Sequence, residues 1–331
     1  MNPNWKNFLL SENAIFDNDT DIVFPSSEHK GDKRIYPVAY LGVLTISGKD
    51  AATFLQGQIT CNINDITDIK SSLGAICNPK GRAITTFLLV KNADVFLMIL
   101  PLELLATVKK RLQMYVLRAA VTLTDSSDDT CLIGLYQGEP ANEVSEHRFA
   151  TSRQENIVVD FQGRCLIISD ADSARRFWAE QRKLGFWPED SAQWRYLDII
   201  SGIPWLSAAT SEQFIPQMLN LDKLGGISFN KGCYTGQEIV ARTHYLGKAK
   251  REMFLAECDT LEPPEPNTAI IDDSTGTEQS IGKVLYAQNK QAICSMLVVL
   301  HVSETHSYNL RLENHNQDKI ILSAVTESLK L

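Results

Sequence analysis

Strand-like and helix-like segments alternate irregularly along this 331-residue chain, and this alternation constrains its fold more than any other feature. Two apolar runs, residues 83–90 and 95–100, flank a short turn and predict a β-hairpin. Apolar residues at helical spacing follow from Leu105, and two more helices are predicted over 172–184 and 192–201. We therefore expect an α+β architecture with mixed or antiparallel sheets rather than a doubly wound parallel sheet.

The chain changes character after residue 249. A proline-rich linker at 262–266 is followed by short β-like runs at 281–286, 293–302 and 319–325, with no predicted helix. Residues 250–331 carry seven basic and twelve acidic residues, a net charge of −5 within the total of −8. We predict an α+β region over 1–249 and a separate C-terminal β-barrel over 250–331.

Composition and charge exclude several classes of protein. The net charge of −8 argues against a surface that holds nucleic acid by bulk electrostatics. Residues 223–251 are an exception, because they contain six basic residues and one acidic residue. This segment can therefore bind an anion, and direct tRNA binding is left open. No apolar run approaches the length of a membrane span and no leader pattern is present, so we expect a cytoplasmic protein. The seven cysteines contain no Cys-x-x-Cys pair, and we predict reduced thiols and no metal site.

The most unusual segment lies at residues 220–245. Thr235 and Glu238 have the spacing of a capping box, which predicts a helix with Thr235 as its N-cap. Cys233 would then lie two residues before a helix N-terminus, where unpaired amides and the Lys231 ammonium favour a thiolate. Side chains two apart on an extended chain point the same way, so Lys231 and Cys233 are predicted to share a cavity as a reactive pair. The alternative is that Cys233 only fills space beside a tight glycine turn.

This segment resembles the signature of a known family. Residues 231–238 read KGCYTGQE and match the K-G-C-Y-x-G-Q-E pattern of the YgfZ family at Lys231, Gly232, Cys233, Tyr234, Gly236, Gln237 and Glu238, with Thr235 at the variable position. The resemblance continues through ISGKDAATFLQGQIT, CNPKGR, QWRYLDIISGIP and residues 212–217, so it covers nearly the whole chain.

The resemblance implies a fold and a function. The fold would be a ring of two interwoven α/β subdomains plus a C-terminal β-barrel, an aminomethyltransferase-like folate-binding fold related to the glycine-cleavage T-protein. Tetrahydrofolate or a one-carbon derivative would bind in the central opening. Members of the family are associated with tRNA modification and with the upkeep of iron-sulfur enzymes, including tRNA-thiolating enzymes, which are the implied partners. By position, Lys231 and Cys233 would be the reactive pair, and Trp194 would lie beside the folate.

Two positions depart from the family pattern. A second folate-contacting tryptophan falls at Leu41, where Tyr40 is the available aromatic substitute. The catalytic carboxylate of the T-protein belongs in the strand after Gly81, where this chain has Thr85 and Thr86, and a hydroxyl cannot act as a carboxylate base. We therefore do not expect an active aminomethyltransferase. Three hypotheses follow: a folate-dependent accessory protein that uses the Lys/Cys pair, a folate-dependent one-carbon transferase, and a non-catalytic folate sensor that docks on a partner protein.

Overall fold

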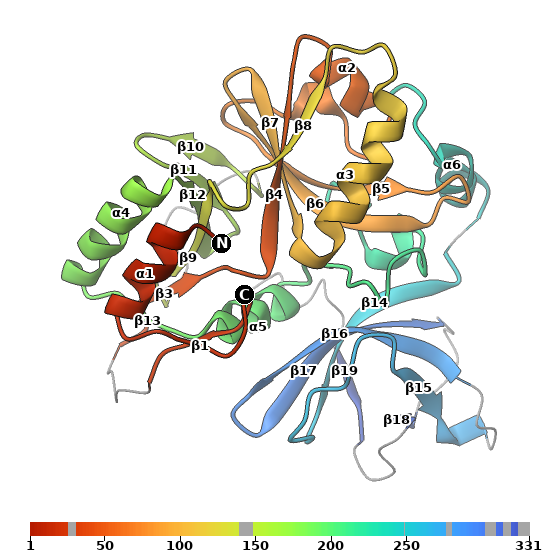
Figure 1. The fold of residues 1–331 in the computed structure, drawn as a ribbon. Coiled ribbons are helices and arrows are strands. Elements are labelled where there is room, and N and C mark those ends of the chain that lie inside the picture. Colours follow the sequence, from red (N-terminus) through yellow and green to blue (C-terminus); the bar gives the residue numbers. More distant parts are fainter. Residues whose placement is uncertain are drawn as a thin grey trace. The chain divides into compact units, whose positions relative to one another are not determined.

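The computed structural model describes residues 1–25, 31–138, 148–247, 249–275, 280–301, 309–313 and 319–323 (Figure 1). Lys248 of the basic segment and the end of the predicted run 319–325 lie outside these ranges. The chain forms two compact units, between which it passes several times. The first unit comprises Met1–Leu55, Asn62–Ser72 and Phe87–Trp194, and the second comprises Gln56–Cys61, Leu73–Thr86 and Arg195–Leu331.

A six-stranded sheet of order β10-β11-β12-β9-β3-β13 forms one part of the first unit. Its strands are β3 (Arg34–Pro37), β9 (Cys131–Tyr136), β10 (Thr151–Arg153), β11 (Ile157–Asp160), β12 (Arg164–Ser169) and β13 (Trp187–Pro188). All neighbours in this sheet pair antiparallel except β13, which runs parallel to β3. Helices α1 (Pro3–Ser11) and α4 (Ala171–Lys183) share a core with it, in which Trp5 and Trp178 meet edge to face at 5.6 Å.

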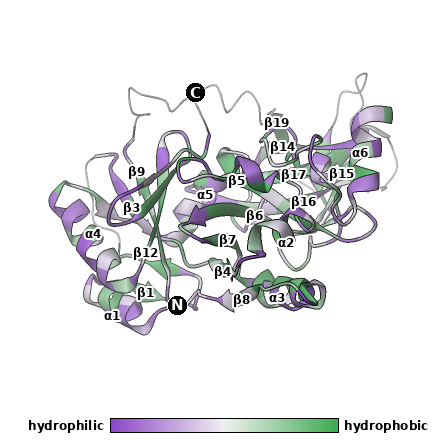
Figure 2. Ribbon diagram, turned by 90° about the horizontal axis from the view of Figure 1, so that it is seen from above, coloured by the Kyte–Doolittle hydropathy of each residue, from purple (hydrophilic) through white to green (hydrophobic). Residues whose placement is uncertain are grey.

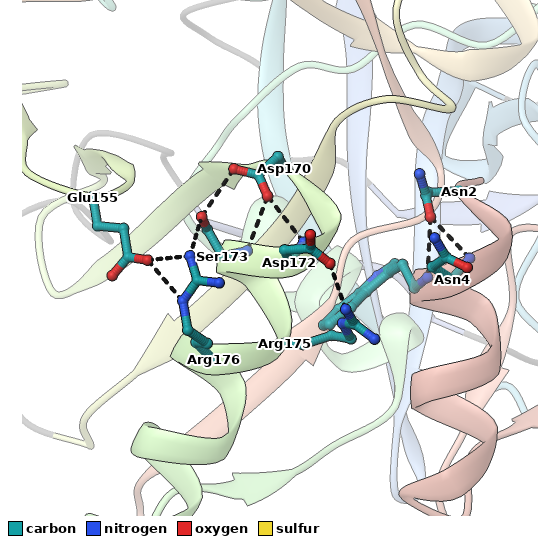
Figure 3. A network of polar contacts seen from close by, with 9 residues as sticks. Asn2, Asn4, Glu155, Asp170, Asp172, Ser173, Arg175 and Arg176 are labelled. Atoms are coloured by element: carbon teal, nitrogen blue, oxygen red, sulfur yellow. Dashed lines mark hydrogen bonds and ion pairs between the residues drawn. The ribbon is translucent and has the colours of Figure 1, made fainter.

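Side-chain caps fix where these two helices begin (Figure 3). Asn2 accepts hydrogen bonds from the Asn4 and Trp5 amides at the start of α1, and Pro3 occupies the first turn, where it needs no donor. Asp170 accepts from the Asp172 and Ser173 amides at the start of α4. These bonds hold the pKa of Asp170 below its ordinary value. Helix α4 carries both hydrophilic and hydrophobic residues (Figure 2), and its buried residues Ala171, Ala174 and Trp178 recur at the spacing of one helix face.

A second sheet, of order β5-β6-β7-β4-β8, is built around the predicted hairpin. Its strands are β4 (Leu41–Ser47), β5 (Ser72–Cys77), β6 (Ala83–Asn92), β7 (Val95–Pro101) and β8 (Thr122–Asp125). The hairpin of β6 and β7 is confirmed, with Leu88 opposite Ile99. Helix α3 (Leu102–Val116) contacts β4 and β7. Of the four residues whose spacing predicts its apolar face, Leu105, Val108 and Leu112 are buried, whereas Tyr115 is exposed. The division between the units falls within β6, after Thr86.

The second unit contains a six-stranded antiparallel sheet of order β18-β15-β16-β17-β14-β19, curled into a half-barrel (Figure 1). Its strands are β14 (Arg251–Cys258), β15 (Ala269–Asp272), β16 (Ser280–Lys290), β17 (Ile293–His301), β18 (Leu310–Leu312) and β19 (Ile321–Ser323). Their inward residues form a core of their own that includes Met296 and Val298. The α+β fold class with a curled C-terminal β-sheet is confirmed, and the domain boundary at 249/250 stays a prediction.

The remaining elements are short connections and two helices that carry candidate residues. The short ones are β1 (Ile15–Phe16), β2 (Ile22–Val23), α2 (Ala51–Gln56), η1 (Ile63–Asp65), η2 (Pro216–Leu219) and η3 (Asp273–Thr275). The helices are α5 (Ser191–Ile200) and α6 (Gln237–Leu246). The helix predicted over 192–201 is confirmed as α5, and we expected its inward face to hold Trp194, Leu197 and Ile200, which is only partly right. Trp194 is buried but Leu197 and Ile200 are half-buried, whereas Asp198 is buried because Trp205 donates a 2.7 Å hydrogen bond to its carboxylate.

Candidate functional site

The signature segment enters helix α6 through a left-handed glycine. Gly236 is the N-cap, with φ of 83°, and no side chain caps the helix, so the prediction of Thr235 as N-cap is wrong. A Cβ at Gly236 would lie 2.4 Å from the Asn78 carbonyl oxygen and 2.9 Å from the Gly81 Cα atom. The close approach of this loop therefore decides where α6 begins, and Cys233 lies three residues before the N-cap.

The Lys231 ammonium is held by backbone oxygens. It donates to the carbonyls of Ile59 at 2.7 Å and Cys61 at 2.8 Å, and it lies 5.1 Å from the centre of the Tyr234 ring. Burial lowers the pKa of Lys231 from 10.5 to about 8. An amine with such a pKa is partly neutral near physiological pH, whereas an ordinary lysine is almost fully charged there.

The segment that receives Lys231 is itself fixed within the second unit. Thr60 donates its hydroxyl to the Gly226 carbonyl at 2.7 Å and accepts from the Ala75 amide at 2.8 Å. The Thr60 carbonyl accepts from the Ser228 amide at 2.9 Å. Residues 59–61 are therefore tied on both sides, and Lys231 meets a preformed pair of carbonyls rather than a loose loop.

Cys233 is the exposed cysteine of the chain. Of the seven cysteines, all described, five are buried, Cys165 is half-buried and Cys233 is exposed. Burial raises the pKa of Cys131 to about 12 and that of Cys165 to about 11, so neither forms a thiolate at neutral pH. No hydrogen bond joins the Cys233 thiol to the Lys231 ammonium in the described structure. The reactive pairing stays a prediction.

Tyr234 and a contact from η2 hold the signature segment and α6 in place. Burial raises the pKa of the Tyr234 hydroxyl above its ordinary value, which keeps that side chain neutral under the Lys231 ammonium. Gln217 donates a 2.6 Å hydrogen bond to the Val240 carbonyl in the second turn of α6. The helix is thus held by η2 as well as by the 78–81 loop.

Trp194 lies in a closed aromatic and cationic cluster of the first unit. Its side chain is 1% exposed. The Arg164 guanidinium lies 4.3 Å from its ring centre, and the rings of Tyr36 and Phe161 lie at 5.5 and 6.4 Å. Gly134 of β9 admits the ring, because a Cβ there would lie 2.3 Å from a ring carbon. A ligand that stacks on Trp194 must displace Arg164 or reach the ring edge, and the folate contact stays a prediction.

Arg164 was not identified from the sequence. Nothing in the sequence indicates that it stacks on Trp194, because the contact needs both the packing of the Trp194 ring of α5 on Gly134 of β9 and the pairing of β12 with β9. Such tertiary packing is not visible in a single sequence.

The other candidate residues are both buried, and one of them, Leu41, lies beside a different cavity of the first unit. Tyr40 and Leu41 are 9% and 5% exposed. Leu41 lines a cavity of about 360 Å³ together with Val38 and Trp5, and Trp194 is not among its lining residues.

In β6, the strand that follows Gly81, threonines occupy the positions where a catalytic carboxylate of the T-protein kind would be expected. Thr85 and Thr86 are buried in β6. Thr85 donates to the Thr86 carbonyl at 2.9 Å, and Thr86 donates to the Pro204 carbonyl at 2.6 Å. Both hydroxyls are engaged as donors to the backbone.

Two kinds of feature are absent from the described residues. No group of three or more metal-ligating side chains is found in the described part of the chain. None of the described helices has both the length and the apolarity to cross a membrane.

The fold is that of an aminomethyltransferase T-protein. The glycine cleavage system aminomethyltransferase T of Bartonella henselae superposes with a TM-score of 0.69 over 89% of this chain and 86% of that protein, at 13% identity. No protein-family model matches the sequence.

Curated relatives define the family. Proteins named tRNA-modifying protein YgfZ are 31% identical in Colwellia psychrerythraea, over 76% of this chain and 80% of that protein, and 33% identical in Hamiltonella defensa, over 69% and 71%. The protein of the same name in Escherichia coli O157:H7 is 34% identical over 67% of this chain and 71% of its own length. The chain belongs to the family of the tRNA-modifying protein YgfZ.

Proposed function

We propose that this chain binds tetrahydrofolate or a one-carbon derivative and supports the modification of tRNA. Membership of a family whose curated members are named tRNA-modifying proteins carries the second part of this proposal. The T-protein fold and the resemblance of the sequence to a folate-binding family support the first part. The site proposed to act is the signature segment 231–238, because it presents the chain's exposed thiol.

The chemistry is proposed to lie with Cys233 and Lys231. The Cys233 thiol is accessible to a partner, and the Lys231 amine has a pKa of about 8, so it can accept a proton near neutral pH. Transfer of the thiol proton to the neutral amine would leave a thiolate beside an ammonium. This step requires Lys231 to leave the carbonyls of Ile59 and Cys61. The carbonyl pair would hold the Lys231 amine before this step.

A folate would be bound by the aromatic and cationic residues around Trp194. The Arg164 guanidinium over the ring suits the anionic tail of a folate, and the indole suits its flat pterin. Because the Trp194 ring is 1% exposed, binding would need this cluster to open. Tyr40 and Leu41 would contribute apolar contact. A bound folate would supply one-carbon or redox chemistry, and no step is assigned to it.

The partners are proposed to be enzymes that act on tRNA, in particular iron-sulfur enzymes that introduce sulfur. An exposed thiol that can be ionised is suited to sulfur-directed or redox chemistry on such an enzyme. The chain itself is proposed to hold no metal. The protein would then support tRNA modification indirectly, by maintaining the iron-sulfur enzymes that carry it out.

A one-carbon transferase is the second candidate, and Thr85 and Thr86 disfavour it. The hydroxyls of both are committed to backbone carbonyls, and no carboxylate stands in that part of β6. We expect a T-protein-type aminomethyl-transfer assay to stay at background. A folate-dependent rate well above background would overturn this expectation.

A variant of Cys233 separates the accessory protein from the folate sensor. Calorimetric titration with tetrahydrofolate and quantification of modified tRNA nucleosides would be compared for the parent chain and for Cys233→Ala. Retained folate binding with lost tRNA modification supports chemistry at Cys233. Retention of both folate binding and tRNA modification by Cys233→Ala supports a sensor. Failure of the parent chain to bind tetrahydrofolate contradicts the proposal.

A further inference from the structure

Three aromatic side chains gather at α6: His244 and Tyr245 are exposed on the helix, and Phe229, half-buried, precedes the signature segment. The rings of Phe229 and His244 stack with centres 3.7 Å apart and planes 12° apart. Tyr245 meets both rings edge to face, at 6.2 Å from Phe229 and 4.8 Å from His244. We name Phe229, His244 and Tyr245 the α6 aromatic group. The rings are already arranged against one another, so a ligand would not have to order them.

The α6 aromatic group faces solvent rather than a core. Tyr245 is 63% exposed and the neighbouring Leu246 is 81% exposed, while Ile239 on the same helix is 36% exposed. A contiguous exposed group of large apolar side chains is unusual on a folded surface and marks a place where another molecule binds. A partner is therefore indicated, and its chemistry follows from the charges around the rings.

Two cations without ion-pair partners in the described structure lie on α6 and on the loop that packs against its start. Arg242 is exposed and precedes Tyr245 by three residues and Leu246 by four, so the three share one side of α6. Lys80 is exposed on the loop that packs against the helix, since a Cβ at the adjacent Gly81 would lie 2.7 Å from the Ile239 Cβ atom.

Of the other described basic residues of 223–251, Lys223 pairs with Glu252 and Lys231 donates to two backbone carbonyls. Lys250 is exposed and Arg251 is half-buried, just beyond the end of α6. Glu238 is the one carboxylate on α6. The charge on and next to α6 is therefore mainly positive, and Arg242 supplies it on the side of Tyr245.

We propose that the α6 aromatic group, with Arg242 and Lys80, binds unpaired bases of RNA. Every base has a flat π face that stacks on an aromatic ring, and every nucleotide carries a phosphate that an arginine or lysine can pair with. An apolar protein partner would not require the two unpaired cations, and a duplex would not offer its bases. The choice of tRNA as the RNA rests on the proposed function, whereas the surface itself requires no folate.

The test measures binding of the full chain to fluorescein-labelled RNA by fluorescence anisotropy. The probes are an unmodified tRNA transcript, a single-stranded 12-nucleotide RNA and the same sequence as a duplex. We expect the single strand and the tRNA to bind at least about tenfold more tightly than the duplex, because stacking needs free bases. Equal affinity for the single strand and the duplex overturns the proposal.

Variants assign the contacts to rings and cations. Tyr245→Leu should weaken single-strand binding about fivefold or more, and Tyr245→Phe, which keeps the ring, should restore most of it. Arg242→Gln should lower the slope of log affinity against log salt concentration by about one. Tyr115→Leu and Lys110→Gln on α3 are the matched controls, since Tyr115 is 38% exposed and Lys110 is exposed, and both should bind as the parent chain does.

The outcomes separate this proposal from the proposed function. If Tyr245→Leu and Arg242→Gln both bind RNA as tightly as the parent chain, with the same salt dependence, the α6 surface is not an RNA site. Tetrahydrofolate titration of the same samples serves as the second measurement. Folate binding without RNA binding refutes this inference alone, and absence of both refutes the proposed function as well.

Discussion

At the scale of single residues, the account depends on Cys233 being the accessible thiol. We predict that a limiting thiol reagent at pH 7 alkylates Cys233 first, at least about tenfold faster than any other cysteine. The reason is that Cys233 is exposed, whereas the half-buried Cys165 has a pKa raised to about 11 and the other five cysteines are buried. Peptide mass spectrometry after short labelling times checks this order. Faster labelling of another cysteine, or unchanged total labelling in Cys233→Ala, would show that the exposed thiol is elsewhere.

Lys231 gives a prediction for pH dependence. Its folded-state pKa of about 8 lies below the ordinary value of 10.5, so between these values the unfolded chain binds a proton that the folded chain does not. Stability therefore rises with pH through this window. The free energy of unfolding of the parent chain, measured relative to that of Lys231→Met, should increase between pH 8 and pH 10. A flat or falling difference would mean that the Lys231 amine is not desolvated.

At the scale of elements, the start of α6 depends on a glycine. Gly236→Ala should lower the free energy of unfolding by about 1–3 kcal/mol, because φ of 83° strains an alanine and its Cβ would lie 2.4 Å from the Asn78 carbonyl oxygen. Gly232→Ala is the matched control four residues earlier, where a Cβ would meet nothing within 4 Å. Urea denaturation measures both. Equal effects of the two substitutions would show that the loop does not set the helix start.

The elements that could be predicted from sequence are those whose signals are local. The β6–β7 hairpin and helices α3 and α4 follow from apolar spacing within each segment. The N-cap of α6 was predicted wrongly because the Thr235 pattern is local, whereas the approach of residues 78–81 to Gly236 is not. Helix α1 was not predicted, since its nine residues give little periodicity and its burial against α4 is tertiary.

The candidate site was predictable to the same extent. The signature segment can be found by its residues alone, and Cys233, the cysteine that the sequence favours as reactive, is exposed. The carbonyl partners of Lys231 could not be found, because Ile59 and Cys61 lie 172 and 170 residues away in the chain. The stacking of Arg164 on Trp194 was hidden for the same reason, since the packing of α5 on the sheet brings these side chains together.

At the scale of the whole molecule, the proposed folate site makes Trp194 necessary for ligand binding. Trp194→Leu keeps apolar bulk and removes the ring, so we expect tetrahydrofolate affinity to fall at least about fivefold. Isothermal titration calorimetry is the suitable measurement, because it does not depend on tryptophan fluorescence. Trp187→Leu is the control, a half-buried tryptophan on β13 beside Arg182. A folded Trp194→Leu protein with unchanged affinity would make Trp194 structural.

The most direct test of the central claim measures modified tRNA nucleosides by mass spectrometry in a bacterial strain that lacks its own member of this family. The strain would be complemented with the parent chain, with Cys233→Ala or with Cys165→Ala, at matched expression. We predict that the parent chain and Cys165→Ala restore the thiolated nucleosides and that Cys233→Ala does not, because Cys233 is the accessible thiol. Full restoration by Cys233→Ala, or none by the parent chain, would contradict the account.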